Sequence, residues 1–306
     1  MKSAKSTTVS TITLRDLRKM VSEGVKMNRE SVRNLVNTYY DIQDYRIAIE
    51  NRIRAASQAA TSEEDTKPEI EVDENGMKIF NPKYDSMSSY SDYMISLGLR
   101  ELEDFIKNAL KAYVDNDPIG QWLTSIMGIG PVIAAGLLSY IDISKCPTAG
   151  HIWSYAGITG TEKKVKGEKL NYSPKFKTLC WKIGQSFIKT SNRPNDIYGH
   201  LYKEKKEWYH HKNDEGGFAE RAKELLETQK ISKDSELYKT YSAGKISDAH
   251  INSMSTRFAV KIFLSHLFEI WYEYENGCKP PKPFVQEHKG HVHIIPAPNR
   301  EVVFKD

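Results

Sequence analysis

A glycine-rich corner between two apolar segments carries the clearest chemical signal in this sequence. Gly128–Gly130 follows an apolar run that begins near Trp122, and Pro131 opens a second apolar run that extends to Tyr140. Glycine can adopt the backbone conformations of a sharp turn, and proline is favoured at the first position of a helix. The unpaired N–H groups of such a helix start, together with the positive end of its dipole, bind anions. We therefore predict an anion-binding corner formed by Gly128, Ile129, Gly130 and Val132.

A basic stretch with interspersed aromatic side chains follows this corner. Lysine ammonium groups neutralise phosphates, and aromatic rings stack on nucleic-acid bases. The alternative is a solvated loop in which Glu162 and Glu168 offset part of the charge, but the position of the stretch after the corner favours binding. The residues that we expect to contact phosphate or base are Lys163, Lys164, Lys166, Lys169, Tyr172, Lys175 and Lys177, with Arg257 and Lys261 from one face of a later helix.

Candidates for catalysis are few. Asp142 lies at the end of the second apolar segment, where a capping or ion-pairing role competes with a catalytic one. Tyr209 and His210 lie in an aromatic and lysine-rich cluster over residues 198–212, which could line a groove for an unstacked base or form helix core beside a solvated face. No metal is predicted, because only Glu287 accompanies the histidines of the carboxy-terminal tail. The sequence contains no Walker lysine motif, and no cofactor is expected.

Apolar residues recur at helical spacing along most of the chain, and long strands are nearly absent, so we predict a mostly α fold. The helices Asn28–Ala59 and Ser89–Val114 should pair as an antiparallel hairpin, with an acidic loop or short exposed β-hairpin over residues 61–81 between them. Further helices are predicted over Thr148–Gly157, Pro174–Thr190, Tyr198–Leu226, with an interruption at Gly216–Gly217, and Ser247–Tyr274. The buried residues expected in Pro174–Thr190 are Phe176, Leu179, Trp181, Ile183, Phe187 and Ile188.

The composition is that of a globular protein with a mildly basic balance. The chain has 306 residues, a net charge of +4, 39% hydrophobic and 27% charged residues, so any nucleic-acid footprint must be local. Three cysteines lie far apart in sequence, which indicates a reducing compartment. The sequence shows neither an apolar run of membrane-spanning length nor a signal-peptide core, so we expect a cytoplasmic protein with no membrane partner.

Three regions are predicted: an amino-terminal helical arm over residues 1–115, a core over residues 116–276 that contains the corner and ends in a helical cap, and an extended tail over residues 277–306. Two apolar helices joined by Gly-Ile-Gly-Pro resemble the helix-hairpin-helix motif, whose usual anion is a nucleic-acid phosphate. The alternative is an ordinary helical hairpin that two glycines turn.

The segment around the corner resembles the carboxy-terminal domain of the DEDD-type insertion-sequence transposases, the transposase 20 family. The resemblance rests on Leu123–Ala135, Asp142–Ser144 and Ser154–Ile158, and continues more weakly through Leu170–Ile188 and Gly244–Trp271. It implies a DNA-binding domain with a role in DNA recombination. Two features of that family have no match: its RuvC-like nuclease half with four acidic residues, and the serine of a Ser-Gly-Gly-Lys-like loop, where this chain has Lys164–Lys169.

Helix-hairpin-helix DNA glycosylases offer a second resemblance. They place a similar hairpin before a catalytic carboxylate, and Gly150–Trp153 is similar to the segment that follows it. The matching carboxylate position is Thr148 or Ala149, the position of the lyase lysine is near Val132, and Asp142 lies too close to the hairpin. A glycosylase would therefore need another carboxylate.

Three functions remain open at this point. The first is a protein that binds the DNA backbone largely independently of the base sequence. Its role would be in DNA processing, recombination or defence against mobile DNA. The second is a DNA glycosylase that excises a damaged or modified base after flipping it, and the third is a transposase that needs a partner or guide RNA. If the chain is an enzyme, we expect a glycosylase-type hydrolase rather than a complete transposase. DNA is the expected partner in each case, and the amino-terminal helices could also pair two chains as a homodimer.

Overall fold

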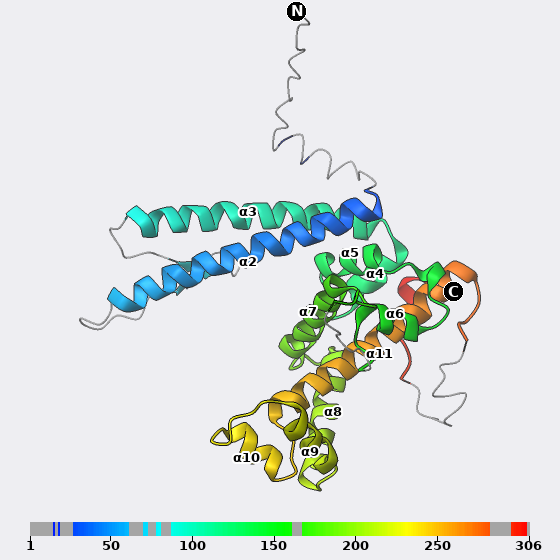
Figure 1. Cartoon of the computed structure of the whole chain (residues 1–306). Helices are drawn as coiled ribbons and strands as arrows, with labels where there is room; N and C mark the ends of the chain where they lie inside the picture. Colours follow the sequence, from blue (N-terminus) through cyan, green and yellow to red (C-terminus); the bar gives the residue numbers. More distant parts are fainter. Residues whose placement is uncertain are drawn as a thin grey trace, which may run out of the picture. The chain divides into compact units, whose positions relative to one another are not determined.

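The computed structural model describes residues 27–60, 70–72, 78–80, 87–160, 167–281 and 295–304, together with Arg15 and Arg18. The chain divides into two compact units, Met1–Asn116 and Asp117–Asp306. The described part of the chain is helical apart from one two-stranded hairpin, which confirms the predicted mostly α fold (Figure 1). Among the described helices, none combines the length and the apolar character that a membrane crossing requires.

The first unit is a pair of long helices, α2 (Arg29–Ala60) and α3 (Met87–Asp115), which pack along each other as predicted. Asn28 caps α2, because its Oδ1 accepts a hydrogen bond from the Ser31 amide at 2.8 Å. Between the helices, β1 (Ile70–Val72) pairs with β2 (Lys78–Phe80) in antiparallel register. The acidic segment therefore contains the short hairpin that the sequence allowed.

An apolar seam and an ion network hold the two helices together. Arg46 of α2 pairs with Glu103 of α3, and Glu50 of α2 accepts from Arg46, Arg100 and Ser96. Burial raises the pKa of Glu50, but the hydrogen bond from Arg46 and the charge of Arg100 outweigh it, so the pKa lies below its usual value. The buried apolar residues of the seam are Val32, Val36, Ile49 and Ile53 of α2 and Ile106, Leu110 and Val114 of α3.

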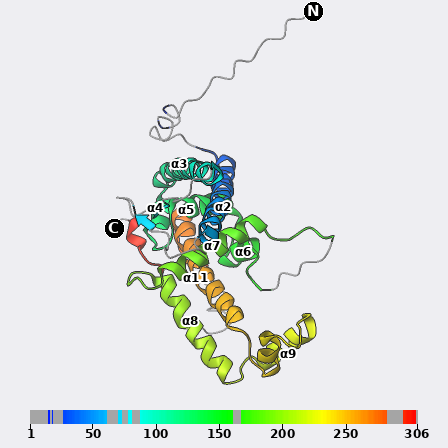
Figure 2. The ribbon, with the colours of Figure 1, turned by 90° about the vertical axis from the view of Figure 1, so that its left-hand side faces the viewer.

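The second unit is built around one long central helix, α11 (Asp248–Asn276), which packs against α4, α6, α7 and α8 (Figure 2). Ser247 caps this helix by accepting a hydrogen bond from the His250 amide. The remaining elements are α4 (Pro118–Ser125), α5 (Pro131–Tyr140), η1 (Ile143–Lys145), α6 (Ala149–Ala156), α7 (Pro174–Thr190), α8 (Ile197–Asp214), α9 (Ala219–Thr228), α10 (Glu236–Ser242) and η2 (Arg300–Val302).

Four aromatic rings form the centre of the second unit. The Phe263 ring of α11 lies 6.3 Å from Trp122, 5.5 Å from Phe187 and 5.2 Å from Tyr198, measured between ring centroids. All four side chains are almost completely buried. Because these residues come from α4, α7, α8 and α11, one cluster joins segments that lie far apart in the sequence.

The described carboxy-terminal residues 295–304 pack against this centre. The Trp122 indole N–H donates to the Pro298 carbonyl at 2.8 Å, and Arg300 pairs with Glu269 and Glu273 of α11. His266 Nε2 lies 2.8 Å from the Ile295 carbonyl, which can only accept, so His266 Nδ1 accepts from the Tyr198 hydroxyl. Burial lowers the pKa of His266, and the neutral ring satisfies both partners, as expected for a core histidine.

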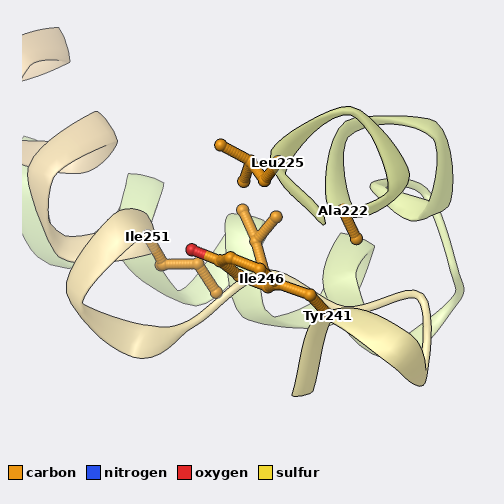
Figure 3. Close-up of a cluster of buried hydrophobic side chains, with 5 residues drawn as sticks. All are labelled: Ala222, Leu225, Tyr241, Ile246 and Ile251. Carbon is orange, nitrogen blue, oxygen red and sulfur yellow. The ribbon is translucent and has the colours of Figure 1, made fainter. Parts of the chain in front are cut away.

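A separate small core lies where α8 ends and α11 begins. Figure 3 shows its five buried side chains gathered between α9, α10 and the start of α11. The Asn213 side chain of α8 makes two hydrogen bonds with the backbone of Ile246, which ties this core to α8. Its members are Ala222, Leu225, Tyr241, Ile246 and Ile251. Helix α10 is not predicted from the sequence, because a helix of seven residues has too few turns for its apolar periodicity to stand out.

The predicted burial of α7 is correct on one face of that helix and wrong for Trp181. Phe176, Leu179, Ile183 and Phe187 are buried, Ile188 is only half-buried, and Trp181 is 58% exposed. The buried positions recur every three or four residues, and Trp181 follows the buried Cys180 by one residue, about 100° further around the helix. Trp181 was predicted to be buried because it is hydrophobic, although its position lies off the buried face of α7.

Candidate nucleic-acid interface

The predicted corner joins α4 to α5, and α7 holds it in place. Gly128 has a φ of 88°, which favours glycine, and a Cβ there would lie 3.2 Å from both Ser186 Oγ and Thr190 Oγ1. The Ser186 hydroxyl donates to the Gly128 carbonyl. Both the backbone conformation and the packing therefore require glycine at position 128.

Gly130 differs from Gly128, because neither its backbone nor its surroundings require glycine. It is the N-cap of α5 with φ −90° and ψ 173°, and a Cβ placed on it would meet nothing within 4 Å among the described residues. The expectation that both glycines serve the turn conformation is therefore wrong for Gly130. Its missing side chain keeps open space in front of the α5 helix start.

The first turn of α5 supplies the unpaired amides that were predicted. The Ala134 amide donates to the Gly130 carbonyl at 3.0 Å and closes the first intrahelical bond, so the amides of Val132 and Ile133 precede it. The side chains of Ile129 and Val132 are buried, at 4% and 7% exposure. These two residues can therefore offer only backbone groups to an anion.

A pocket of about 420 Å³ lies between α7 and α11, at the end of α6. We call it the α7–α11 pocket. Its lining includes Lys177, Trp181 and Gln185 of α7, and Asn252, Ser253 and Arg257 of α11. On α7 these residues stand four positions apart, and on α11 the adjacent Asn252 and Ser253 lie about one turn before Arg257. Each helix therefore presents one face to the pocket. Every described residue that lines the pocket is neutral or basic.

Close helix packing forms the floor of this pocket. A Cβ on Gly184 of α7 would lie only 2.3 Å from Thr256 Cγ2 of α11, so glycine allows the two helices to approach there. Cys180, Thr256 and Val260 lie on this floor and are buried. Burial raises the pKa of the Cys180 thiol, which therefore stays protonated and behaves as an apolar group.

Two of the predicted basic residues, Lys177 and Arg257, meet in the α7–α11 pocket. Neither has a carboxylate partner among the described residues. The Lys177 ammonium lies 4.6 Å from the centroid of the Tyr172 ring, and Tyr172 packs so closely on Gly157 that a Cβ there would lie 2.6 Å from its ring. Tyr172 therefore positions Lys177 at the edge of the pocket.

The other predicted contact residues lie elsewhere. The Lys261 ammonium is 3.4 Å from the Thr159 carbonyl and 5.1 Å from the centroid of the Trp153 ring. Lys169 and Lys175 are exposed near the start of α7. Lys163, Lys164 and Lys166 lie outside the described residues.

The corner and the pocket contact opposite faces of α7. The pocket is lined by Lys177, Trp181 and Gln185, whereas the corner packs on Ser186, Phe187 and Thr190. At about 100° per residue, the centres of these two sets lie roughly half a turn apart. The corner and the pocket are therefore two separate places on the second unit.

The three weak catalytic candidates lie outside the lining of the pocket. Asp142 pairs with Lys145 at 3.1 Å and accepts from the Ser144 hydroxyl, which fits the ion-pairing alternative. Tyr209 packs on Trp208 and Phe218, where burial raises its pKa and Arg257 lowers it. The His210 ring lies 3.8 Å from Asp248.

Five polar or aromatic residues of the pocket were not predicted as site residues. They are Trp181, Gln185, Asn252, Ser253 and Thr256. A signal was present, because Lys177, Trp181 and Gln185 stand four residues apart and share the face of α7 opposite its buried stripe. The pairing of this face with α11 depends on long-range contacts that local spacing does not reveal.

The corner and the Gly157–Ile158 edge of the pocket lie in the part of the chain that is similar to a known protein family. No curated protein and no solved structure matches the chain. One family model does match, over a segment that begins in α4 and includes α5, α6 and the Gly157–Ile158 edge of the pocket. Residues 120–167 of the chain are similar to the Transposase IS116/IS110/IS902 family.

Proposed function

We propose that this chain binds DNA in a transposition or recombination process, and that residues 116–276 form the DNA-binding domain. The observation that carries the proposal is that Lys177 and Arg257 both line one pocket whose described lining is neutral or basic. A partly buried cation without a carboxylate partner loses hydration that an anionic ligand can replace. The family similarity over residues 120–167 supports the phosphate of DNA as that anion.

The start of α5 is a second proposed phosphate contact. The amides of Val132 and Ile133, the positive end of the helix dipole and the open space at Gly130 together suit a phosphate oxygen. Because this contact and the pocket lie on opposite faces of α7, they should act independently. Variants at the two places can therefore be separated in one binding assay.

A gel shift of the full chain with plain duplex DNA at two salt concentrations tests the proposal. Lysine and arginine contacts to phosphate release counterions, so the affinity should fall steeply as the salt concentration rises. Two duplexes of unrelated sequence should bind with similar affinity, because backbone contacts carry no sequence information. Absence of salt-sensitive binding would remove the proposed function.

Gly130→Val should lower the affinity for every duplex about tenfold, or about 1.4 kcal/mol, while leaving the fold intact. The φ of −90° is open to valine, and a Cβ at position 130 meets no described atom within 4 Å. The two methyl groups of valine would occupy the space in front of the α5 amides. The measurement is the dissociation constant of the variant beside its thermal melting curve.

Gly130→Ala is the matched control, because a single Cβ at this position meets no described atom within 4 Å and leaves most of the space in front of the α5 amides open. It should bind DNA as the wild type does. If Gly130→Val also binds like the wild type, the α5 start does not contact phosphate.

We also propose that the amino-terminal arm pairs two copies of this chain. A two-helix hairpin buries a single seam, and four-helix packing would cover large apolar side chains that both helices leave exposed. These residues are Tyr45, Ile47, Met94, Ile95, Leu97 and Leu102. Sedimentation of the full chain should give a dimer at micromolar concentration, and Met94→Lys with Leu102→Lys should give a monomer. A monomeric wild type at that concentration would exclude the pairing.

A further inference from the structure

Trp181 is the most unusual side chain of the α7–α11 pocket. At 58% exposure it is the most exposed large hydrophobic residue in the described part of the chain. The buried stripe of α7 does not include it, so the fold does not explain a tryptophan there. Exposed aromatic rings at the edge of a basic pocket are typical of sites where nucleic-acid bases stack.

Trp208, the other exposed tryptophan, differs from Trp181 in what surrounds its ring. Trp208 is also exposed, at 49%, but lysine side chains of the same helix already contact its ring. The Lys205 ammonium lies 3.6 Å from the Trp208 ring centroid, and the Lys212 ammonium lies 5.4 Å away. Among the described residues, no ring or cation contacts Trp181 in this way. Trp181 therefore offers a free π surface beside the pocket.

The pocket also contains groups that suit the polar edge of a base. The Lys206 ammonium lies 3.3 Å from the Tyr202 hydroxyl oxygen, and that hydroxyl donates to Asn252 Oδ1 at 2.6 Å. This chain of hydrogen bonds fixes the Asn252 amide and leaves its NH₂ group to donate. Gln185 adds a second side-chain amide to the lining. Side-chain amides of this kind pair with base edges.

The two cations complete the set of groups that a nucleotide needs. Lys177 and Arg257 line the same pocket as Trp181 and Asn252. A Cβ on Gly160 would lie 3.6 Å from the Arg257 guanidinium, which places that group beside the start of the basic loop. A pocket of about 420 Å³ is within the range of small-molecule sites and can hold one planar base with its phosphate.

We propose that the α7–α11 pocket takes a single unpaired nucleotide of DNA. The base stacks on Trp181 and pairs with the Asn252 amide, and the flanking phosphate binds Lys177 and Arg257. This inference rests on the proposed DNA binding and names the substrate more closely: DNA with an unpaired nucleotide, rather than a continuous duplex. It requires no chemical step, only that the nucleotide has left the base stack.

The test compares the affinity of the full chain for a plain duplex and for the same duplex with one bulged nucleotide. The wild type should bind the bulged duplex about tenfold more tightly, which is the value of one stacked base. Trp181→Ala should remove this preference, so that the variant binds the two duplexes with similar affinity, whereas Trp181→Phe should keep most of the preference. Trp208→Ala, the matched control, should keep the full preference.

The outcomes separate this inference from the proposed function. If the wild type binds both duplexes equally well, or if Trp181→Ala keeps the preference, the pocket does not hold an unpaired base although the chain binds DNA. If the wild type binds neither duplex, both the inference and the proposed function are wrong. A melting curve of Trp181→Ala that matches the wild type excludes unfolding as the cause of a loss.

Discussion

Replacing Lys177 and Arg257 together by glutamate should lower the affinity for duplex DNA about a hundredfold. A charge-assisted hydrogen bond contributes about 1.5–3 kcal/mol, so the loss of two such bonds exceeds the roughly 2.7 kcal/mol that a hundredfold change requires. The slope of the logarithm of affinity against the logarithm of salt concentration should become shallower by about 1, because the two cations bind one phosphate and each neutralised phosphate contributes about 0.9. Binding titrations at several salt concentrations measure both quantities.

A second double variant with the same change in net charge distinguishes loss of the pocket's cations from a general effect of charge on DNA binding. Lys223 and Lys230 are exposed on and beside α9, away from the lining of the pocket. Lys223→Glu with Lys230→Glu should change the affinity only slightly. Equal losses in the two double variants would mean that overall charge, and not the α7–α11 pocket, controls binding.

The local elements of this fold were predictable because their signals are local. Pro174 and Thr190 bound α7 as the sequence indicated, since Ser173 caps the helix and Pro174 fits its first position. Ser247 and Gly277 similarly bracket α11. Such signals depend on residues within one turn of the helix end, so they do not require knowledge of the rest of the chain.

The candidate site was predictable only in part, because long-range packing assembles it. Arg257 was expected to bind phosphate, but its meeting with Lys177 depends on the approach of α7 and α11 at Gly184. The separation of the corner from the pocket follows from the contact of Gly128 with Ser186, 58 residues further along the chain. No periodicity in either segment encodes such a contact.

The same long-range packing places Phe263 at the centre of the second unit. Its ring contacts Trp122, Phe187 and Tyr198, which lie on three other helices. Phe263 follows Arg257 by six residues on α11, so the helix that carries the pocket also carries the centre of the core. Loss of this ring should therefore affect both stability and binding.

Phe263→Ala should lower the free energy of unfolding of the second unit by about 3–5 kcal/mol, the usual cost of truncating a buried phenylalanine. Urea unfolding followed by tryptophan fluorescence measures this change, because Trp122 lies against the Phe263 ring. Phe258→Ala, a truncation of a half-buried ring on the same helix, should cost clearly less. Equal losses would show that any truncation on α11 is equally disruptive. In mild urea, Phe263→Ala should lose DNA binding as the unit unfolds, whereas Lys177→Glu with Arg257→Glu should lose it without unfolding.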